Sequence, residues 1–134
     1  MTRKDIVKLK ERVLECGGKR FQKDEYLEMD MPPELVKKLL KSGKCEAGKN
    51  AKRLKVGAGR CHENTAYLAV NEGHKACTGL ALSNDGIWRV HSWARDKGTG
   101  QLIETTERRT KYFGICGTLD DIGLDDTWED FDDD

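Results

Sequence analysis

The spacing of apolar residues predicts helices in the first part of the chain. Across residues 5–16 they recur at helical intervals, with Asp5 placed to cap the start and Gly17-Gly18 after the end. A second helix is predicted to begin at Pro33, which a first helical turn tolerates, and to end at Gly43. The apolar faces of these helices consist of Ile6, Leu9, Val13 and Leu14, and of Leu35, Val36, Leu39 and Leu40.

A different pattern follows in the second part of the chain. Residues 41–60 are basic and rich in glycine, which predicts a solvated connector. A third helix is predicted to begin at Cys61 and to end near residue 70. Short apolar runs predict strands over 76–82, 87–94, 101–106 and 112–116, with turns at 83–86 and 96–100. The pattern therefore predicts an α+β fold with N-terminal helices, a central helix that carries the cysteine, and an antiparallel β-meander.

The length of 134 residues is typical of one domain, which we expect to span residues 1–119. Charged residues make up 36% of the chain, so a heavily charged surface is expected. No apolar run approaches the roughly 18 residues of a membrane span, and residues 1–5 lead into charged positions without an apolar signal region. These features predict a cytoplasmic protein that does not contact a membrane.

The formal net charge of zero conceals an uneven distribution. Residues 120–134 contain nine of the 24 acidic residues and no basic ones, which leaves 24 basic and 15 acidic residues in the rest of the chain. Within this acidic tail, Ile122, Leu124, Trp128 and Phe131 interrupt the charges. Large apolar residues among acidic ones favour docking, either onto the basic body or onto a protein partner.

The cysteine content is an odd number, five, without a Cys-x-x-Cys pair. In a reducing cytosol we expect most of these residues to be buried thiols, and at most one or two to carry chemistry. They are Cys16, Cys45, Cys61, Cys77 and Cys116.

Three of the polar residues suggest nucleophilic chemistry. Cys61 opens a predicted helix, whose dipole favours the thiolate over the thiol. His91 on the second predicted strand is the candidate general base, and Glu104 on the third is the candidate acceptor of an imidazole N–H. Alternation along the strand places His91 on one face with Arg89 and Trp93, which we expect to be a cleft wall rather than core.

Further residues near these three are candidates for binding a substrate. The backbone N–H of Cys61 lies at a helix start, where it can stabilise an oxyanion. Asn64, one turn later, is placed to orient a substrate, and Trp93 is placed to wall an acyl-binding groove.

This order of residues resembles the core motif of the transglutaminase-like superfamily, which belongs to the papain-related thiol enzymes. The resemblance covers about residues 57–115 and rests on Gly59-x-Cys61 with Ala66, on His91-Ser92-Trp93, and on Glu104-Thr105-Thr106. It implies a Cys61–His91–Glu104 triad that hydrolyses or transfers the acyl group of a peptide or small acyl substrate, without a cofactor. Two features depart from that family: the acidic residue is Glu instead of Asp, and only one strand fits between Cys61 and His91.

Two other interpretations remain open at the level of sequence. Cys61, His62, His74 and Cys77 are four ligand types that suit tetrahedral zinc, although their spacing matches no common finger. Alternatively, the chain is a non-catalytic binding module, with a basic body and an acidic docking tail, that engages a protein or a nucleic acid. Nucleic acid is the less favoured partner, because the basic connector at 41–60 lacks aromatic residues for base stacking.

Overall fold

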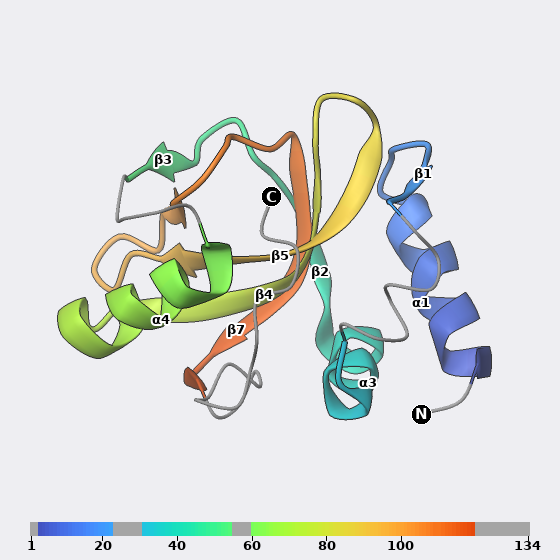
Figure 1. Ribbon diagram of the computed structural model, residues 1–134, viewed down its shortest axis with the longest axis horizontal. Coiled ribbons are helices and arrows are strands. Elements are labelled where there is room, and N and C mark those ends of the chain that lie inside the picture. Colours follow the sequence, from blue (N-terminus) through green and yellow to red (C-terminus); the bar gives the residue numbers. More distant parts are fainter. Residues whose placement is uncertain (1–2, 23–30, 55–59, 120–134) are drawn as a thin grey trace.

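The computed structural model describes residues 3–22, 31–54 and 60–119, which form three helices and a curled, mixed β-sheet (Figure 1). The predicted α+β class is confirmed. The helices are α1 (Arg3–Leu14), α3 (Pro33–Ser42) and α4 (Cys61–Glu72). The strands are β1 (Arg20–Phe21), β2 (Lys44–Ala47), β3 (Lys52–Arg53), β4 (Lys75–Leu82), β5 (Ile87–Arg95), β6 (Leu102–Glu104) and β7 (Lys111–Gly117).

The order of the strands differs from the predicted meander. The sheet runs β2-β7-β4-β5-β6-β3, and β1 pairs in parallel with β5. The last strand, β7, thus returns to pair with β4 instead of continuing beyond β6. The prediction that residues 41–60 are a solvated connector is also wrong, since this segment contributes β2 and β3. These strands hold mostly exposed side chains and form through backbone pairing to β7 and β6, so no hydrophobic pattern marks them.

The connection between β2 and β3 forces the sheet to curl. Only residues 48–51 separate these two strands, yet they pair at opposite ends of the sheet. Four residues cannot span a flat sheet of six strands, because neighbouring strands lie nearly 5 Å apart. The sheet therefore has an outer and an inner face.

The outer face carries all three helices of the described chain. Leu80, Trp88 and Phe113 pack with α1 and α3 in the largest hydrophobic cluster. Ala94 and Ile103 pack against Leu68 of α4 at the other end of the sheet, and Figure 1 shows α4 separated from α1 and α3 by the strands. The two N-terminal helices thus pack against the sheet.

The inner face holds a separate cluster built around Trp93 and Tyr112. Their rings have centroids 4.8 Å apart, and Ala51 from the β2–β3 turn covers them. His91 shares this face, because residues two apart on a strand point the same way. The side chains of His91 and Trp93 are 0% and 2% exposed, so the expectation of a cleft wall is wrong for His91, whereas Trp93 borders a pocket. The curl of the sheet, which the sequence pattern does not contain, buries them.

A disulfide joins Cys77 on β4 to Cys116 on β7, its partner in the ladder between these strands. Most of the five cysteines were expected to be buried thiols, whereas this pair is oxidised. The two cysteines are 39 residues apart in the sequence, so only the non-meander order of the strands brings them together. The disulfide fixes β7 beside β4, on the face that holds Trp93.

Removing this disulfide is expected to destabilise the protein. A Cys77→Ala, Cys116→Ala double variant should lose about 2–4 kcal/mol of unfolding free energy, because the unfolded chain regains the freedom of a long closed loop. Urea unfolding followed by tryptophan fluorescence measures this loss. Cys45→Ala is the control, since Cys45 is exposed and lies outside the disulfide. Equal unfolding midpoints for the double variant and the parent would contradict the expected constraint.

Candidate active site

The predicted pairing of His91 with Glu104 is present in the structure. His91 Nε2 lies 2.9 Å from Glu104 Oε1 and 3.0 Å from Oε2, and both side chains are fully buried. His91 comes from the middle of β5 and Glu104 from the last position of β6. With Nε2 directed at the carboxylate, Nδ1 is the ring nitrogen that can act as a base toward another group.

Additional donors hold the Glu104 carboxylate in place. The Tyr112 hydroxyl donates to Oε1 at 2.6 Å, and the backbone N–H and hydroxyl of Thr106 both donate to Oε2 at 3.0 Å. Arg109 Nη2 donates in turn to Thr106 Oγ1 at 3.4 Å. Each carboxylate oxygen therefore has partners, which is the condition under which a buried acid remains ionised.

The electrostatics of the cluster favour an ionised Glu104. Burial opposes ionisation of Glu104, but the positive charge of His91 and hydrogen bonds from His91, Tyr112 and Thr106 outweigh it. The result is a pKa of about 2 for Glu104, below its usual 4.5. Burial, together with the nearby Glu104 charge, raises the pKa of Tyr112, so its hydroxyl keeps its proton and remains a donor.

Cys61 is the first residue of α4 and is 1% exposed. Arg60, at the N-cap, has an extended backbone and contributes no side-chain cap, so the positive end of the helix dipole is not offset by a capping side chain. Glu63 points away and forms an ion pair with Arg60 at 3.5 Å, with its side chain 67% exposed. The Glu63 carboxylate therefore lies in solvent.

The start of α4 lies on the same stretch of β5 as His91. His62 Nδ1 forms a hydrogen bond with Ser92 Oγ, which lies 2.9 Å from Thr78 Oγ1. Ser92 and His91 are adjacent and point to opposite faces of the sheet. Among the described strands, β1 pairs with β5 only at 87–88 and β6 only at 94–95, so this edge of β5 has no strand partner over 89–93. His62, near the start of α4, contacts this stretch of β5.

Both predicted substrate-binding residues carry a buried donor without a described partner. Within residues 3–22, 31–54 and 60–119, Asn64 Nδ2 and Trp93 Nε1 form no hydrogen bond. Asn64 is one turn after Cys61 on α4, and Trp93 is two residues after His91 on β5. Buried donors are normally paired, so each is a position where an acceptor from a ligand would be stabilising.

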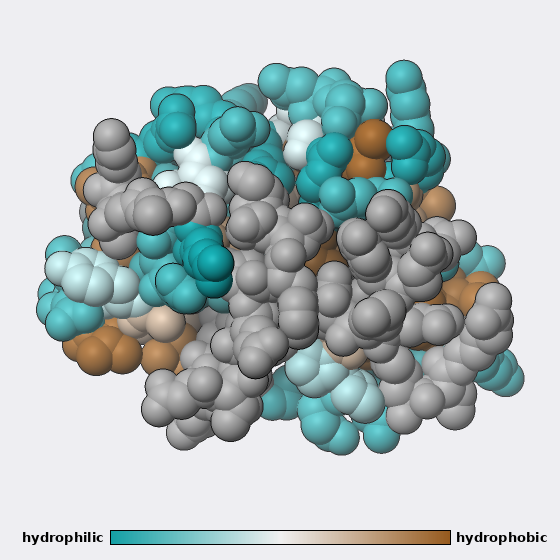
Figure 2. Space-filling view, viewed as in Figure 1, coloured by the Kyte–Doolittle hydropathy of each residue, from teal (hydrophilic) through white to brown (hydrophobic). Residues whose placement is uncertain are grey.

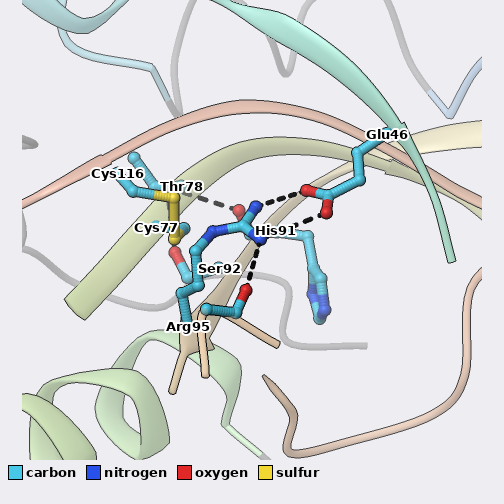
Figure 3. Close-up of a disulfide and its surroundings, with 8 residues drawn as sticks. Glu46, Cys77, Thr78, His91, Ser92, Arg95 and Cys116 are labelled. Carbon is cyan, nitrogen blue, oxygen red and sulfur yellow. Dashed lines mark hydrogen bonds and ion pairs between the residues drawn. A yellow bond between two sulfur atoms is a disulfide. The ribbon is translucent and has the colours of Figure 1, made fainter. Parts of the chain in front are cut away.

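A pocket of about 500 Å³ opens on the face of the sheet that holds Trp93 and Tyr112. Arg95 spans it, donating from both terminal nitrogens to the carboxylate of Glu46 on β2 (Figure 3). The same view shows the Cys77–Cys116 disulfide close by, and the pocket reaches Cys116. The pocket therefore has an aromatic floor next to the Glu104 network and a charged rim.

The structure does not assemble the predicted zinc ligands. Cys77 has no thiolate to offer because it is in the disulfide, and His62 Nδ1 is bonded to Ser92. His74 accepts the backbone N–H of Lys97 at 3.2 Å. No group of three or more potential metal ligands occurs in the described part of the chain.

The acidic tail, residues 120–134, lies outside the described residues.

Several residues of the site were not predicted from the sequence. Tyr112 reaches Glu104 because β7 pairs with β4, which directs the Tyr112 side chain to the inner face. No sequence feature near Tyr112 indicates this pairing. Thr106 had a weak signal, because a threonine two residues after an acid can bond to it. His62 was considered as a zinc ligand, whereas it is buried against Ser92.

Comparison with known proteins finds no matching family model, curated protein or solved structure. Within the described residues, every helix is too short or too polar to cross a membrane. Function must therefore be argued from the site itself.

Proposed function

We propose that the protein is a cysteine-dependent hydrolase or acyltransferase that acts on an amide or ester bond. Cys61 is the nucleophile, His91 the general base, and Glu104 the residue that orients His91. The observation that carries the proposal is the buried His91–Glu104 pair, with both carboxylate oxygens hydrogen-bonded. We also propose the corresponding fold, a papain- or transglutaminase-like core. In such a core a helix presents a cysteine to a histidine–acid pair.

The chemistry follows from the roles of the three side chains. Glu104 accepts Nε2–H and stabilises the charged ring, so His91 Nδ1 takes the Cys61 proton. The sulfur attacks the carbonyl carbon, and the oxyanion forms beside the backbone N–H groups at the start of α4. His91 then protonates the leaving amine or alcohol, which leaves a thioester on Cys61. Water or an amine, deprotonated by His91, attacks the thioester and restores the thiol.

The proposal requires the Cys61 sulfur to reach His91 at the open edge of β5. His62, the neighbour of Cys61, is already bonded to Ser92 at that edge. Because the strand edge between residues 88 and 94 has no described partner strand, a helix tip can approach His91 from the side instead of across the sheet.

The pocket and the two buried donors indicate where a substrate would bind. Asn64 Nδ2 is a candidate donor to the carbonyl oxygen of the substrate. Trp93 and Tyr112 border the pocket, Lys44 lies at its rim, and the charge of Arg95 there is paired with Glu46. A peptide or small acyl compound is the proposed substrate for this lining.

The order in which the cysteines are alkylated tests the proposal. Exposure alone predicts that Cys45 reacts with iodoacetamide before Cys16, and Cys16 before Cys61. An activated thiolate reverses this order, so at pH 6–7 Cys61 should react fastest in the folded protein. Peptide mapping after timed quenching measures all three rates. Labelling of Cys61 only after unfolding would contradict the enzymatic proposal.

One observation favours a second function, that of a non-catalytic binding module. Cys61 is nearly inaccessible, as an inert packing residue would be. In that case the exposed Tyr67 and Val70 of α4 are the natural contact surface, and Figure 2 shows a hydrophobic patch at the end of the molecule that α4 occupies. A protein partner remains the proposed ligand for this module. The cytoplasmic location stays a prediction. The Cys77–Cys116 disulfide counts against it, since stable disulfides are rare in reducing compartments.

A further inference from the structure

The end of α1 is held against the outer face of the sheet beside β2. The Lys111 side chain on β7 donates to the carbonyl oxygen of Cys16, which follows α1. In the ladder between β2 and β7, Lys111 lies opposite Ala47 and Phe113 lies opposite Cys45. Residues two apart on a strand share a face, so Cys45 and Lys111 both face α1.

This arrangement brings two thiols into contact. The side chains of Cys16 and Cys45 are neighbours, with Cys16 half-buried and Cys45 exposed, and the Cys16 thiol also donates to the Arg12 carbonyl oxygen at 3.8 Å. Burial, together with the interaction with Cys45, raises the pKa of Cys16 to about 12. Cys45 is the more exposed sulfur, so a small disulfide reaches it first. The contact joins residues that are far apart in the sequence, and the backbone on each side is fixed by a helix end and a paired strand.

We propose that Cys16 and Cys45 form a second, reversible disulfide that ties α1 to β2. The Cys45 thiolate attacks a small-molecule disulfide such as oxidised glutathione, and one equivalent of the small thiol leaves. The Cys16 sulfur then attacks Cys45 Sγ, its proton passes to water, and a second equivalent of thiol is released. The two protein thiols are oxidised and the small disulfide is reduced, so atoms and electrons balance.

The oxidised form differs from the described one in two respects. It closes a loop from residue 16 to residue 45, which contains α3, so the N-terminal helices are tied to the sheet covalently. It also leaves Cys61 as the single thiol of the chain, since Cys77 and Cys116 are already joined. The inference is independent of the proposed catalytic role of Cys61, because it rests on the other end of the sheet.

Thiol counting after equilibration with oxidised glutathione tests the proposal. The full-length protein is quenched with an alkylating reagent in guanidinium, so that buried thiols are counted too. The three cysteines outside the Cys77–Cys116 disulfide should fall to one, and peptide mapping should recover a Cys16–Cys45 cross-link. The melting temperature should rise by about 10 °C, as expected for a closed loop of this length.

Two variants separate this outcome from others. Cys16→Ser should lose the cross-link and the increase in melting temperature, and Cys45 should instead carry a stable glutathione adduct. Cys61→Ser should retain both the cross-link and the increase. Persistence of all three thiols in the parent protein, or accumulation of glutathione on Cys45 without closure, would overturn the proposal.

Discussion

Replacing His91 with alanine is expected to slow the alkylation of Cys61 at pH 7 by about 100-fold. Beside an imidazolium, a cysteine ionises with a pKa well below 7, whereas a buried thiol without that charge ionises above its usual 8.5. The fraction of thiolate at neutral pH then falls from nearly all to about one per cent. The same change should lower kcat/KM for an activated ester by about 10²–10⁴-fold, because the general base is lost.

The pH dependence of alkylation distinguishes this effect from a change in packing. In the parent protein the rate at Cys61 should be nearly level from pH 6 to pH 8, while in His91→Ala it should rise about tenfold per pH unit. The matched control is His74→Ala, which removes a histidine ring that accepts the backbone N–H of Lys97 in the turn after β5. A Cys61 rate that is equal in the parent and in His91→Ala would refute the base assignment and leave the binding module.

Replacing Glu104 with glutamine is expected to destabilise the protein at pH 7 by about 3–5 kcal/mol. The amide cannot accept from all four donors that now bind the carboxylate, and the charge of His91 loses its buried partner. Urea unfolding at pH 7 measures the loss. Glu63→Gln is the control, since its side chain is exposed and pairs only with Arg60 among the described residues, and the expected change is within about 0.5 kcal/mol.

The same carboxylate predicts how stability depends on pH. The pKa of Glu104 is about 2 in the folded protein and near 4.5 when the chain is unfolded. The unfolded state therefore binds the proton more tightly, and the stabilisation is complete above pH 4.5. It is lost as the pH falls from 4.5 through 2, and it amounts to about 3 kcal/mol. In Glu104→Gln the slope of unfolding free energy against pH in this window should be smaller. Identical slopes would show that Glu104 is not held ionised.

The sequence predicted much of the candidate site because its parts are local. The helix at Cys61 and the strands at His91 and Glu104 each follow from nearby apolar periodicity. The pairing of His91 with Glu104 then follows from neighbouring strands joined by a short turn. The supporting donors were missed, because Tyr112 comes from a strand whose position in the sheet depends on a crossover.

The exposure of the site could not be predicted in the same way. Alternation correctly placed His91 and Trp93 on one face, yet alternation does not say what covers that face. The cover comes from Ala51 and the turn between β2 and β3, in a segment that reads as a solvated connector. Backbone pairing at a sheet edge depends little on side-chain type, so such strands leave almost no sequence signal.

The amino-acid sequence by itself determined the α+β class, the main helices and strands, and the order cysteine, histidine, acid along them. These features follow from the period of apolar residues and from turn and cap residues, which act over a few positions. Tertiary structure alone decided the strand order, the Cys77–Cys116 disulfide, the contact between Cys16 and Cys45, and the burial of His91 and Glu104. Each depends on which distant segments meet, and that is set by the summed burial and backbone pairing of the whole chain instead of by any local pattern.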